Sequence, residues 1–177
     1  MLRSILKLQL NKVLIRNFSS TTVKSSLSLS LRGNSNGYIQ KLETLGGGKA
    51  HVIQNDLFEE LGGTDLHPDP IHHLFSSVSG CQNITAKKVS EDLGIKIGKA
   101  DIQTDSSLSL VLKDPKKYPG FKIDTLKVVY EVETNATDEQ FDQLRELTEE
   151  LCPIAQVFIN SKGLQFDSIW VKKPLLE

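Results

Sequence analysis

Leucine alternates with serine near the start of the chain, at Leu27, Leu29 and Leu31. This is the period of a half-buried strand. Residues 33–37 (GNSNG) then gather residue types that tolerate left-handed turn geometry. The pattern predicts a hairpin whose return strand covers residues 38–42, followed by a glycine turn at 46–48 and a third strand over 49–55.

A longer pattern with helical spacing follows the loop LGGTDLHPDP. Asp69 is a favourable N-cap, Pro70 suits the first helical position, and Gly94 suits a left-handed C-terminal cap. The sequence therefore predicts a helix over residues 70–93. Its apolar positions are Ile71, Leu74, Phe75, Val78, Cys81, Val89 and Leu93.

The second half of the chain returns mainly to strand patterns. Residues 95–104, 107–112, 121–133 and 164–173 have strand character, with a bulge expected near Asp124 and Thr125. Thr137 and Gln140 form a capping box that opens a second helix, which Pro153 interrupts or restarts. The order of strands, long helix, strands, helix and strand predicts an α+β fold with mainly antiparallel pairing.

Composition narrows the classes of function. The 177 residues are 38% hydrophobic and carry a formal net charge of −1. No run approaches the ~20 apolar residues that span a bilayer, and no basic footprint for nucleic acid is present. We therefore expect neither a membrane nor a nucleic-acid partner.

The charge is unevenly distributed, since residues 1–42 hold seven Lys or Arg and no Asp or Glu. A basic, acid-free and serine-rich start without a continuous apolar segment is typical of an organelle transit peptide; a basic disordered tail is the alternative. We divide the chain into a mitochondrial transit peptide (1–18), an N-terminal hairpin segment (19–45) and a main domain (46–177). Removal of residues 1–18 would change the net charge from −1 to −5.

The chain has two cysteines, Cys81 within the long helix and Cys152 just before Pro153. Cys81 alone fits a small apolar core residue. Cys152 at the start of a new helix would meet unpaired N–H groups, which favour a thiolate and lower the thiol pKa. In the reducing mitochondrial matrix a cysteine pair is redox-active or unpaired more often than structural, so inert residues and a working pair both remain open.

Two other motifs suggest a metal site and a phosphate site, but the spacing of their residues does not match the known motifs for either. His67, His72 and His73 crowd Asp69, but they match no recognised zinc pattern, and adjacent helical residues diverge by about 100°. GGGKA lacks the Gly and Ser/Thr positions of a phosphate-binding loop. We expect no metal and no cofactor.

Together, a glycine turn, the loop LGGTD-x-x-P-D-P, the helix containing LF and SGC, and a second helix followed by CP-I resemble the OsmC/Ohr family over residues 46–171. The resemblance marks residues 46–177 as an OsmC-like domain. It implies an α+β fold in which antiparallel sheets wrap around two central helices in an intertwined homodimer.

The same resemblance implies thiol-dependent reduction of organic or hydrogen peroxides. Cys81 matches the peroxidatic cysteine and Cys152 the resolving cysteine, and the disulfide that they form would be reduced by a dithiol. The alternative is a non-enzymatic OsmC-like dimer that serves as a thiol sensor or binds a small ligand.

The family's hydroperoxidases activate their cysteine with an Arg from the hairpin and a Glu after the helix-opening proline. Here Ile71 follows that proline, and the glycine turn offers Lys49. The remaining candidates to support a Cys81 thiolate are Lys49, His73, which lies about 80° from Cys81 around the helix, and Arg145 on the second helix.

Overall fold

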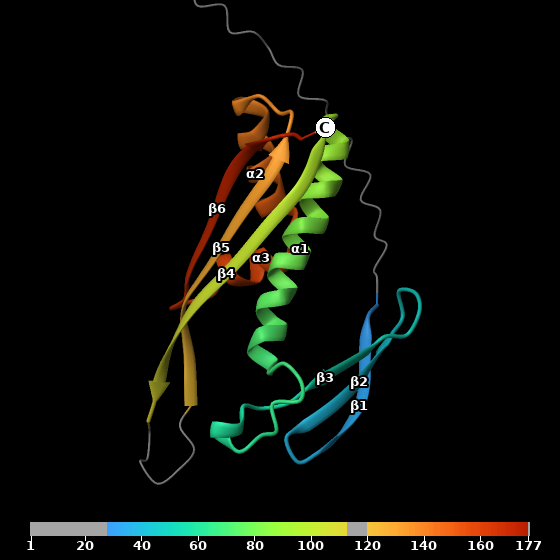
Figure 1. Ribbon diagram of the computed structural model, residues 1–177, viewed down its shortest axis with the longest axis vertical. Coiled ribbons are helices and arrows are strands. Elements are labelled where there is room, and N and C mark those ends of the chain that lie inside the picture. The colour runs from blue at the N-terminus through green and yellow to red at the C-terminus, as the bar shows by residue number, and fades with distance from the viewer. Residues whose placement is uncertain (1–27, 113–119, 177) are drawn as a thin grey trace, which may run out of the picture.

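The computed structural model describes residues 28–112 and 120–176. The transit peptide expected at residues 1–18 lies outside the described residues, as does the first part of the hairpin segment. The described chain forms two three-stranded sheets, three α-helices and one 3-10 turn (Figure 1). In chain order the elements are β1 (Ser30–Asn36), β2 (Ile39–Leu45), β3 (Val52–Asn55), η1 (Glu59–Leu61), α1 (Pro70–Leu93), β4 (Ile97–Val111), β5 (Gly120–Thr134), α2 (Asp138–Leu151), α3 (Pro153–Ile159) and β6 (Gln165–Pro174).

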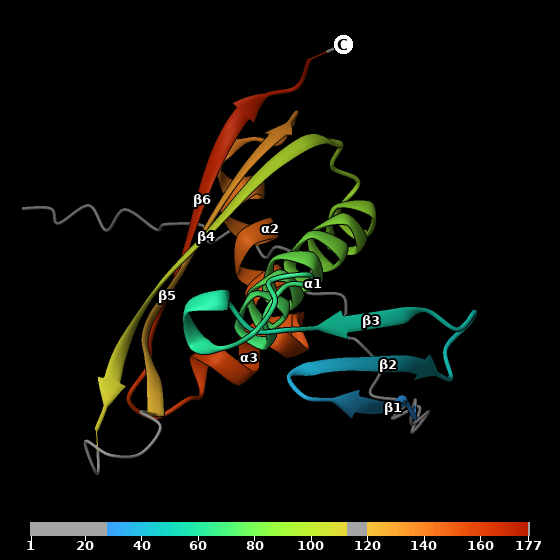
Figure 2. The same cartoon turned by 60° about the horizontal axis from the view of Figure 1, so that its bottom comes forward.

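The larger sheet has the order β4-β5-β6, and the three helices cover one of its faces (Figure 2). The smaller sheet, β1-β2-β3, lies near the start of α1. This is the α+β architecture that the order of sequence patterns predicts.

β5 supplies the centre of the core. Leu126, Val128, Tyr130 and Val132 alternate along one of its faces, and all four have no exposed surface, as expected of a strand whose side chains alternate between faces. One cluster joins Leu126 and Val128 to residues of α1 and α3; another joins Tyr130 and Val132 to α1 and α2. Strand β5 therefore fixes the positions of all three helices.

Helix boundaries follow the predicted caps. The Asp69 carboxylate accepts from the backbone N–H groups of Ile71 and His72 at 2.8 and 3.3 Å. Gly94 ends α1 at φ 68°, in the left-handed region. The capping box of Thr137 and Gln140 opens α2. The predicted limits of the long helix are confirmed.

Strand pairing is mainly antiparallel, as predicted, with one exception. β4 and β5 are antiparallel, with a register shift that leaves Asp124 as a bulge, as predicted. β6, however, pairs with β5 in parallel. Helices α2 and α3 form the crossover between these strands and return the chain to the same end of the sheet, which is the connection that parallel pairing requires.

The turn of the N-terminal hairpin is shorter than predicted, since the sequence pattern placed it over residues 33–37. β1 continues to Asn36, and only Gly37 and Tyr38 form the turn. Gly37 has φ 60°, a conformation suited to glycine in a two-residue hairpin turn. Gly33 lies inside β1 instead, where an added Cβ would be 2.0 Å from the carbonyl oxygen of Lys41.

Within residues 28–112 and 120–176, none of the helices has the length and apolar character needed to cross a membrane.

Candidate redox site

Cys81 lies in the middle of α1, at the edge of the helix face that enters the core. Its neighbours Val78 and Gln82 are fully buried, and Cys81 itself is partly exposed. On the adjoining face, Leu74 and Ile84 are 39% and 66% exposed. Cys81 therefore keeps part of its surface exposed beside exposed apolar side chains of α1.

Cys152 ends α2 and begins α3. It has no exposed surface, and its Sγ accepts a hydrogen bond from the Ala155 N–H at 3.4 Å. Pro153 explains the break, because proline cannot donate to the ladder of α2 but suits the first position of α3. The predicted place of Cys152 at a helix start is confirmed.

The predicted effect of that helix start on the Cys152 thiol is wrong. Burial raises its pKa and outweighs the Ala155 N–H, which acts in the opposite direction. The Cys81 thiol raises the Cys152 pKa further, by a hydrogen bond and by charge. Cys152 is therefore held as a neutral thiol.

The Cys81 and Cys152 thiols are 71 positions apart in the sequence, but they lie close enough for Cys81 to raise the pKa of Cys152. Both are free cysteines. The fold thus brings together a partly exposed thiol and a buried one at the junction of α1 with α3. Neighbouring thiols with suitable Cα and Cβ separations can be oxidised to a disulfide.

Arg145 lies on α2 among carboxylates. Its guanidinium is 3.4 Å from Glu146 and 4.0 Å from both Asp142 and Glu149. In the described parts of the chain, no ion pair or hydrogen bond joins Arg145 to Cys81 or Cys152.

Within one chain, Lys49 and His73 also lie away from both cysteines. Lys49 is exposed in the turn between β2 and β3. His73 Nε2 donates to the Gln54 carbonyl oxygen at 2.9 Å and so ties the start of α1 to β3. His73 precedes Cys81 by eight residues, about 12 Å along the helix. Of the five predicted site residues, the structure brings together only the two cysteines.

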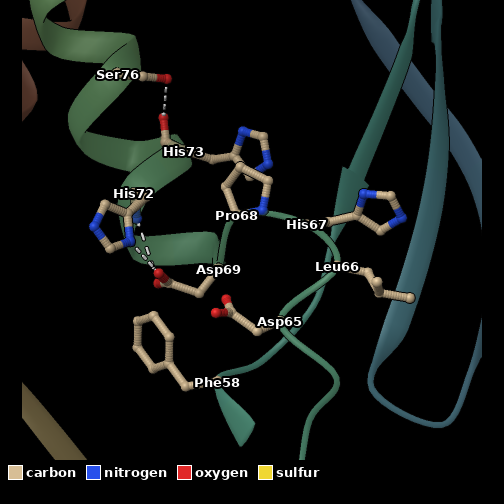
Figure 3. Close-up of a pocket in the computed structure, with 9 residues that line it drawn as sticks. All are labelled: Phe58, Asp65, Leu66, His67, Pro68, Asp69, His72, His73 and Ser76. Carbon is tan, nitrogen blue, oxygen red and sulfur yellow. Dashed lines mark hydrogen bonds and ion pairs between the residues drawn. The ribbon is translucent and has the colours of Figure 1, made fainter.

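A second group of polar residues surrounds a cavity of about 630 Å³ at the start of α1 (Figure 3). The buried Asp69 carboxylate caps α1 and also binds Nδ1 of His72. The Phe58 ring meets His72 edge to face, with ring centroids 6.1 Å apart. The crowding of histidines is visible in the sequence, but the pairing of Asp69 with His72 was not predicted. Their spacing by three positions, which places two side chains on the same face of a helix, is the signal for it.

This histidine group is not arranged for a metal. Among the residues that the structure describes, no three His, Cys, Asp or Glu side chains are placed to hold a metal ion.

The fold is that of an α+β protein with two free cysteines near one another, one of them on its long helix. Residues 63–166, more than half of the chain, match the family model described as "OsmC-like protein". The chain therefore belongs to the OsmC-like family, which confirms the resemblance seen in the sequence.

Solved structures agree with this assignment. An OsmC-like protein from Mycoplasma pneumoniae aligns with a TM-score of 0.60 at 13% identity, covering 84% of this chain and 98% of that one. Two organic hydroperoxide resistance proteins are also similar. The Legionella pneumophila protein has a TM-score of 0.59 at 17% identity, covering 84% and 99% of the two chains. The Elizabethkingia anophelis protein has a TM-score of 0.63 at 14% identity, covering 85% and 99%.

At these identities the structural likeness establishes the fold. No curated protein sequence matches this chain.

Proposed function

We propose that this protein reduces organic hydroperoxides through Cys81 and Cys152. The observation that carries the proposal is the proximity of a partly exposed thiol on α1 to a buried thiol at the start of α3, whose pKa it raises. Membership of the OsmC-like family, and the similarity to proteins described as organic hydroperoxide resistance proteins, support a peroxide-related redox role.

The difference in exposure supports Cys81 as the peroxidatic and Cys152 as the resolving cysteine. The Cys81 thiolate attacks the distal oxygen of the hydroperoxide, the O–O bond breaks, and the alkoxide takes a proton and leaves as the alcohol. Cys81 becomes a sulfenic acid. The Cys152 sulfur then attacks the Cys81 sulfur, water leaves, and a disulfide forms.

Turnover requires a donor of two electrons. A dithiol attacks the Cys81–Cys152 disulfide, passes through a mixed disulfide and leaves as its own cyclic disulfide, restoring both protein thiols. The net reaction converts a hydroperoxide and a dithiol into an alcohol, water and a disulfide.

We further propose that the working unit is a homodimer. Large apolar side chains are exposed on α1 and on or just before the N-terminal sheet: Leu74, Ile84, Leu29, Leu31 and Val52 are between 39% and 67% exposed. A group of exposed large apolar side chains is typical of an interface. Support of the Cys81 thiolate by Lys49 requires a second copy, because Lys49 lies in an exposed turn of the smaller sheet. His73 and Arg145 stay as further candidates for this support.

The charge asymmetry of the first 42 residues supports import into the mitochondrial matrix, with residues 1–18 as the targeting segment. A fluorescent fusion to these 18 residues should accumulate in mitochondria. A fusion in which Arg3, Lys7, Lys12 and Arg16 are replaced by Gln should stay in the cytosol, and equal import of both fusions would contradict this proposal.

The activity is tested by consumption of cumene hydroperoxide with excess dithiothreitol. We expect wild-type protein to turn over many times and Cys81→Ser to lose the activity. Cys152→Ser, treated with the peroxide in the absence of dithiothreitol, should stop at a sulfenic acid that dimedone traps. Consumption by Cys81→Ser at the wild-type rate would contradict the proposal.

The alternative function, a thiol sensor without turnover, is favoured by one feature. Ile71 occupies the position where the family's hydroperoxidases carry an activating Glu. A sensor whose disulfide dithiothreitol does not reduce would consume one peroxide per chain and then stop. Multiple turnover therefore separates the two functions.

A further inference from the structure

Gln82, the residue after Cys81, is a polar residue in the core of the protein. It has no exposed surface, and Val78 and Ala86, one helical turn before and after it on α1, are fully buried as well. A buried amide is costly unless its polar atoms are hydrogen-bonded. In the part of the chain that the structure describes, the Oε1 atom of Gln82 has no hydrogen-bond partner. An apolar side chain would extend the core without this cost, so the amide requires an explanation.

The other polar atom of this amide bonds to the large sheet. Nε2 of Gln82 donates to Oγ of Ser168 on β6 at 3.1 Å, and the same oxygen accepts the indole N–H of Trp170 at 3.1 Å. We call Gln82 and Ser168 the polar layer. It lies between the two apolar clusters of the core, whose neighbouring residues on α1 and β6 are Val78 and Phe166 on one side and Ala86 and Trp170 on the other.

The polar layer connects the two segments that carry the cysteines. Cys81 immediately precedes Gln82 on α1. Cys152 begins α3, and a short loop leads from α3 into β6. A stacked pair of phenylalanine rings, one on each element and 5.9 Å apart between centroids, packs α3 against β6. The bond from Gln82 to Ser168 therefore links the helix that carries Cys81 to the unit that carries Cys152.

We propose that Gln82 is a positioning residue of the redox site, which holds α1 at the axial position where Cys81 and Cys152 can form a disulfide. The inference rests on the proposed chemistry of these two cysteines. A disulfide requires Cα atoms about 4.4–6.8 Å apart, and a shift of α1 by one residue moves Cys81 by about 1.5 Å. Apolar contacts are non-directional, whereas the bond between Gln82 and Ser168 forms at one axial position only.

This role does not require a second copy of the chain. Gln82 has no exposed surface within one chain, and its hydrogen-bond partner belongs to the same chain. The contacts that fix α1 against β6 are therefore complete in a single subunit.

The test is the equilibrium between the two thiols and their disulfide in mixtures of oxidised and reduced glutathione. One oxidised glutathione is cleaved for each protein disulfide formed, and the two thiol protons pass to two molecules of reduced glutathione. The full chain is equilibrated at a series of ratios, quenched with acid and alkylated, and its intact mass separates the disulfide from glutathione adducts. The equilibrium constant measures how well the fold places the two sulfur atoms, and no peroxide is needed.

Gln82→Met removes the hydrogen bond and keeps a side chain of similar size. We expect it to lower the equilibrium constant for disulfide formation about fivefold, as loss of one hydrogen bond of ordinary strength would. The urea midpoint of the reduced protein should stay the same or rise, because an amide with an unpartnered oxygen gives way to an apolar group. An unchanged constant would overturn the inference. So would a fall in the constant with an equal loss of stability, since that would show a merely structural role.

Ser90→Ala is the matched control. Ser90 is also fully buried on α1, but its hydroxyl donates to the Lys87 carbonyl oxygen within the same helix. It therefore makes no bond that could fix the axial position of α1 on the sheet. We expect Ser90→Ala to change the equilibrium constant less than about twofold, and a fall as large as that of Gln82→Met would overturn the inference.

Ser168→Ala breaks the same bond from the other side and should also lower the constant. In the Ser168→Ala background, Gln82→Met should have little further effect, because two residues that act through one bond are not additive. A further fivefold fall in the double variant would show that Gln82 acts through another contact and would overturn the inference.

Wild-type protein separates this inference from the proposed function. If wild-type protein formed no disulfide at any glutathione ratio, the proposed redox pair itself would be wrong. If wild-type protein formed the disulfide and Gln82→Met formed it equally well, only the positioning role of Gln82 would be wrong.

Discussion

The two cysteines should differ sharply in their reaction with an alkylating reagent in the folded protein. Cys81 is partly exposed on α1, whereas Cys152 has no exposed surface beneath α3. To expose Cys152, α3 must separate from the core and uncover Phe158, which is 4% exposed, and Ala155, which is fully buried.

The cost of that opening sets the size of the effect. Burial of a Phe side chain contributes about 1.5–3 kcal/mol and that of a methyl group about 0.8 kcal/mol, so opening requires roughly 2.3–3.8 kcal/mol. At about 1.4 kcal/mol per factor of ten, labelling of Cys152 should be slowed by about 40- to 500-fold relative to the unfolded chain. The raised pKa of the Cys152 thiol slows labelling further, because less thiolate is present.

The assay is timed alkylation with iodoacetamide, in buffer and in urea, followed by peptide mass spectrometry. Phe158→Ala should accelerate labelling of Cys152 by at least about tenfold without changing that of Cys81. The control is Val157→Ala, since Val157 is 60% exposed on the same helix. Labelling of Cys152 in buffer within about threefold of its rate in urea would refute the reasoning.

Three further predictions concern the framework of the site. Gly33→Ala would place a Cβ 2.0 Å from the Lys41 carbonyl oxygen, so hydrogen exchange should rise in β1 and β2 while the β4-β5-β6 sheet stays protected; unchanged exchange in β1 and β2 would refute this. Thr137→Ala removes the capping box of α2 and should lower the free energy of unfolding in urea by about 1 kcal/mol, whereas Thr137→Ser should change it little. Asp56 has a folded pKa of about 2, below its ordinary 3.8, so the unfolded chain binds more protons and the contribution of Asp56 to stability falls as pH drops from about 4 to 2. Asp56→Asn should flatten that part of the pH dependence in acid unfolding, and an unchanged profile would contradict the assignment.

Features that depend on a few neighbouring residues were predictable from the sequence. The ends of α1 follow from Asp69, Pro70 and Gly94, because caps act within one turn of the helix. Two helices meeting at Cys152 follow from Pro153. The bulge at Asp124 follows from the change of phase in the apolar pattern of β5.

Features that depend on distant segments were predicted less well. The parallel pairing of β5 with β6 depends on how the α2–α3 crossover packs on the sheet. No local sequence pattern indicates this pairing. The pKa of Cys152 is raised because burial outweighs the helix start, and burial is a property of the assembled core. The cavity around His72 likewise needs a loop and a helix that only the fold brings together.

The central claim, that Cys81 and Cys152 form a redox pair, is tested most directly by the intact mass of the full chain after one equivalent of cumene hydroperoxide. The account predicts the loss of both free thiols and a decrease of about 2 Da in wild-type protein, and neither change in Cys81→Ser. Unchanged thiols in wild-type protein, or a stable sulfinic acid on Cys81 with Cys152 still free, would contradict it.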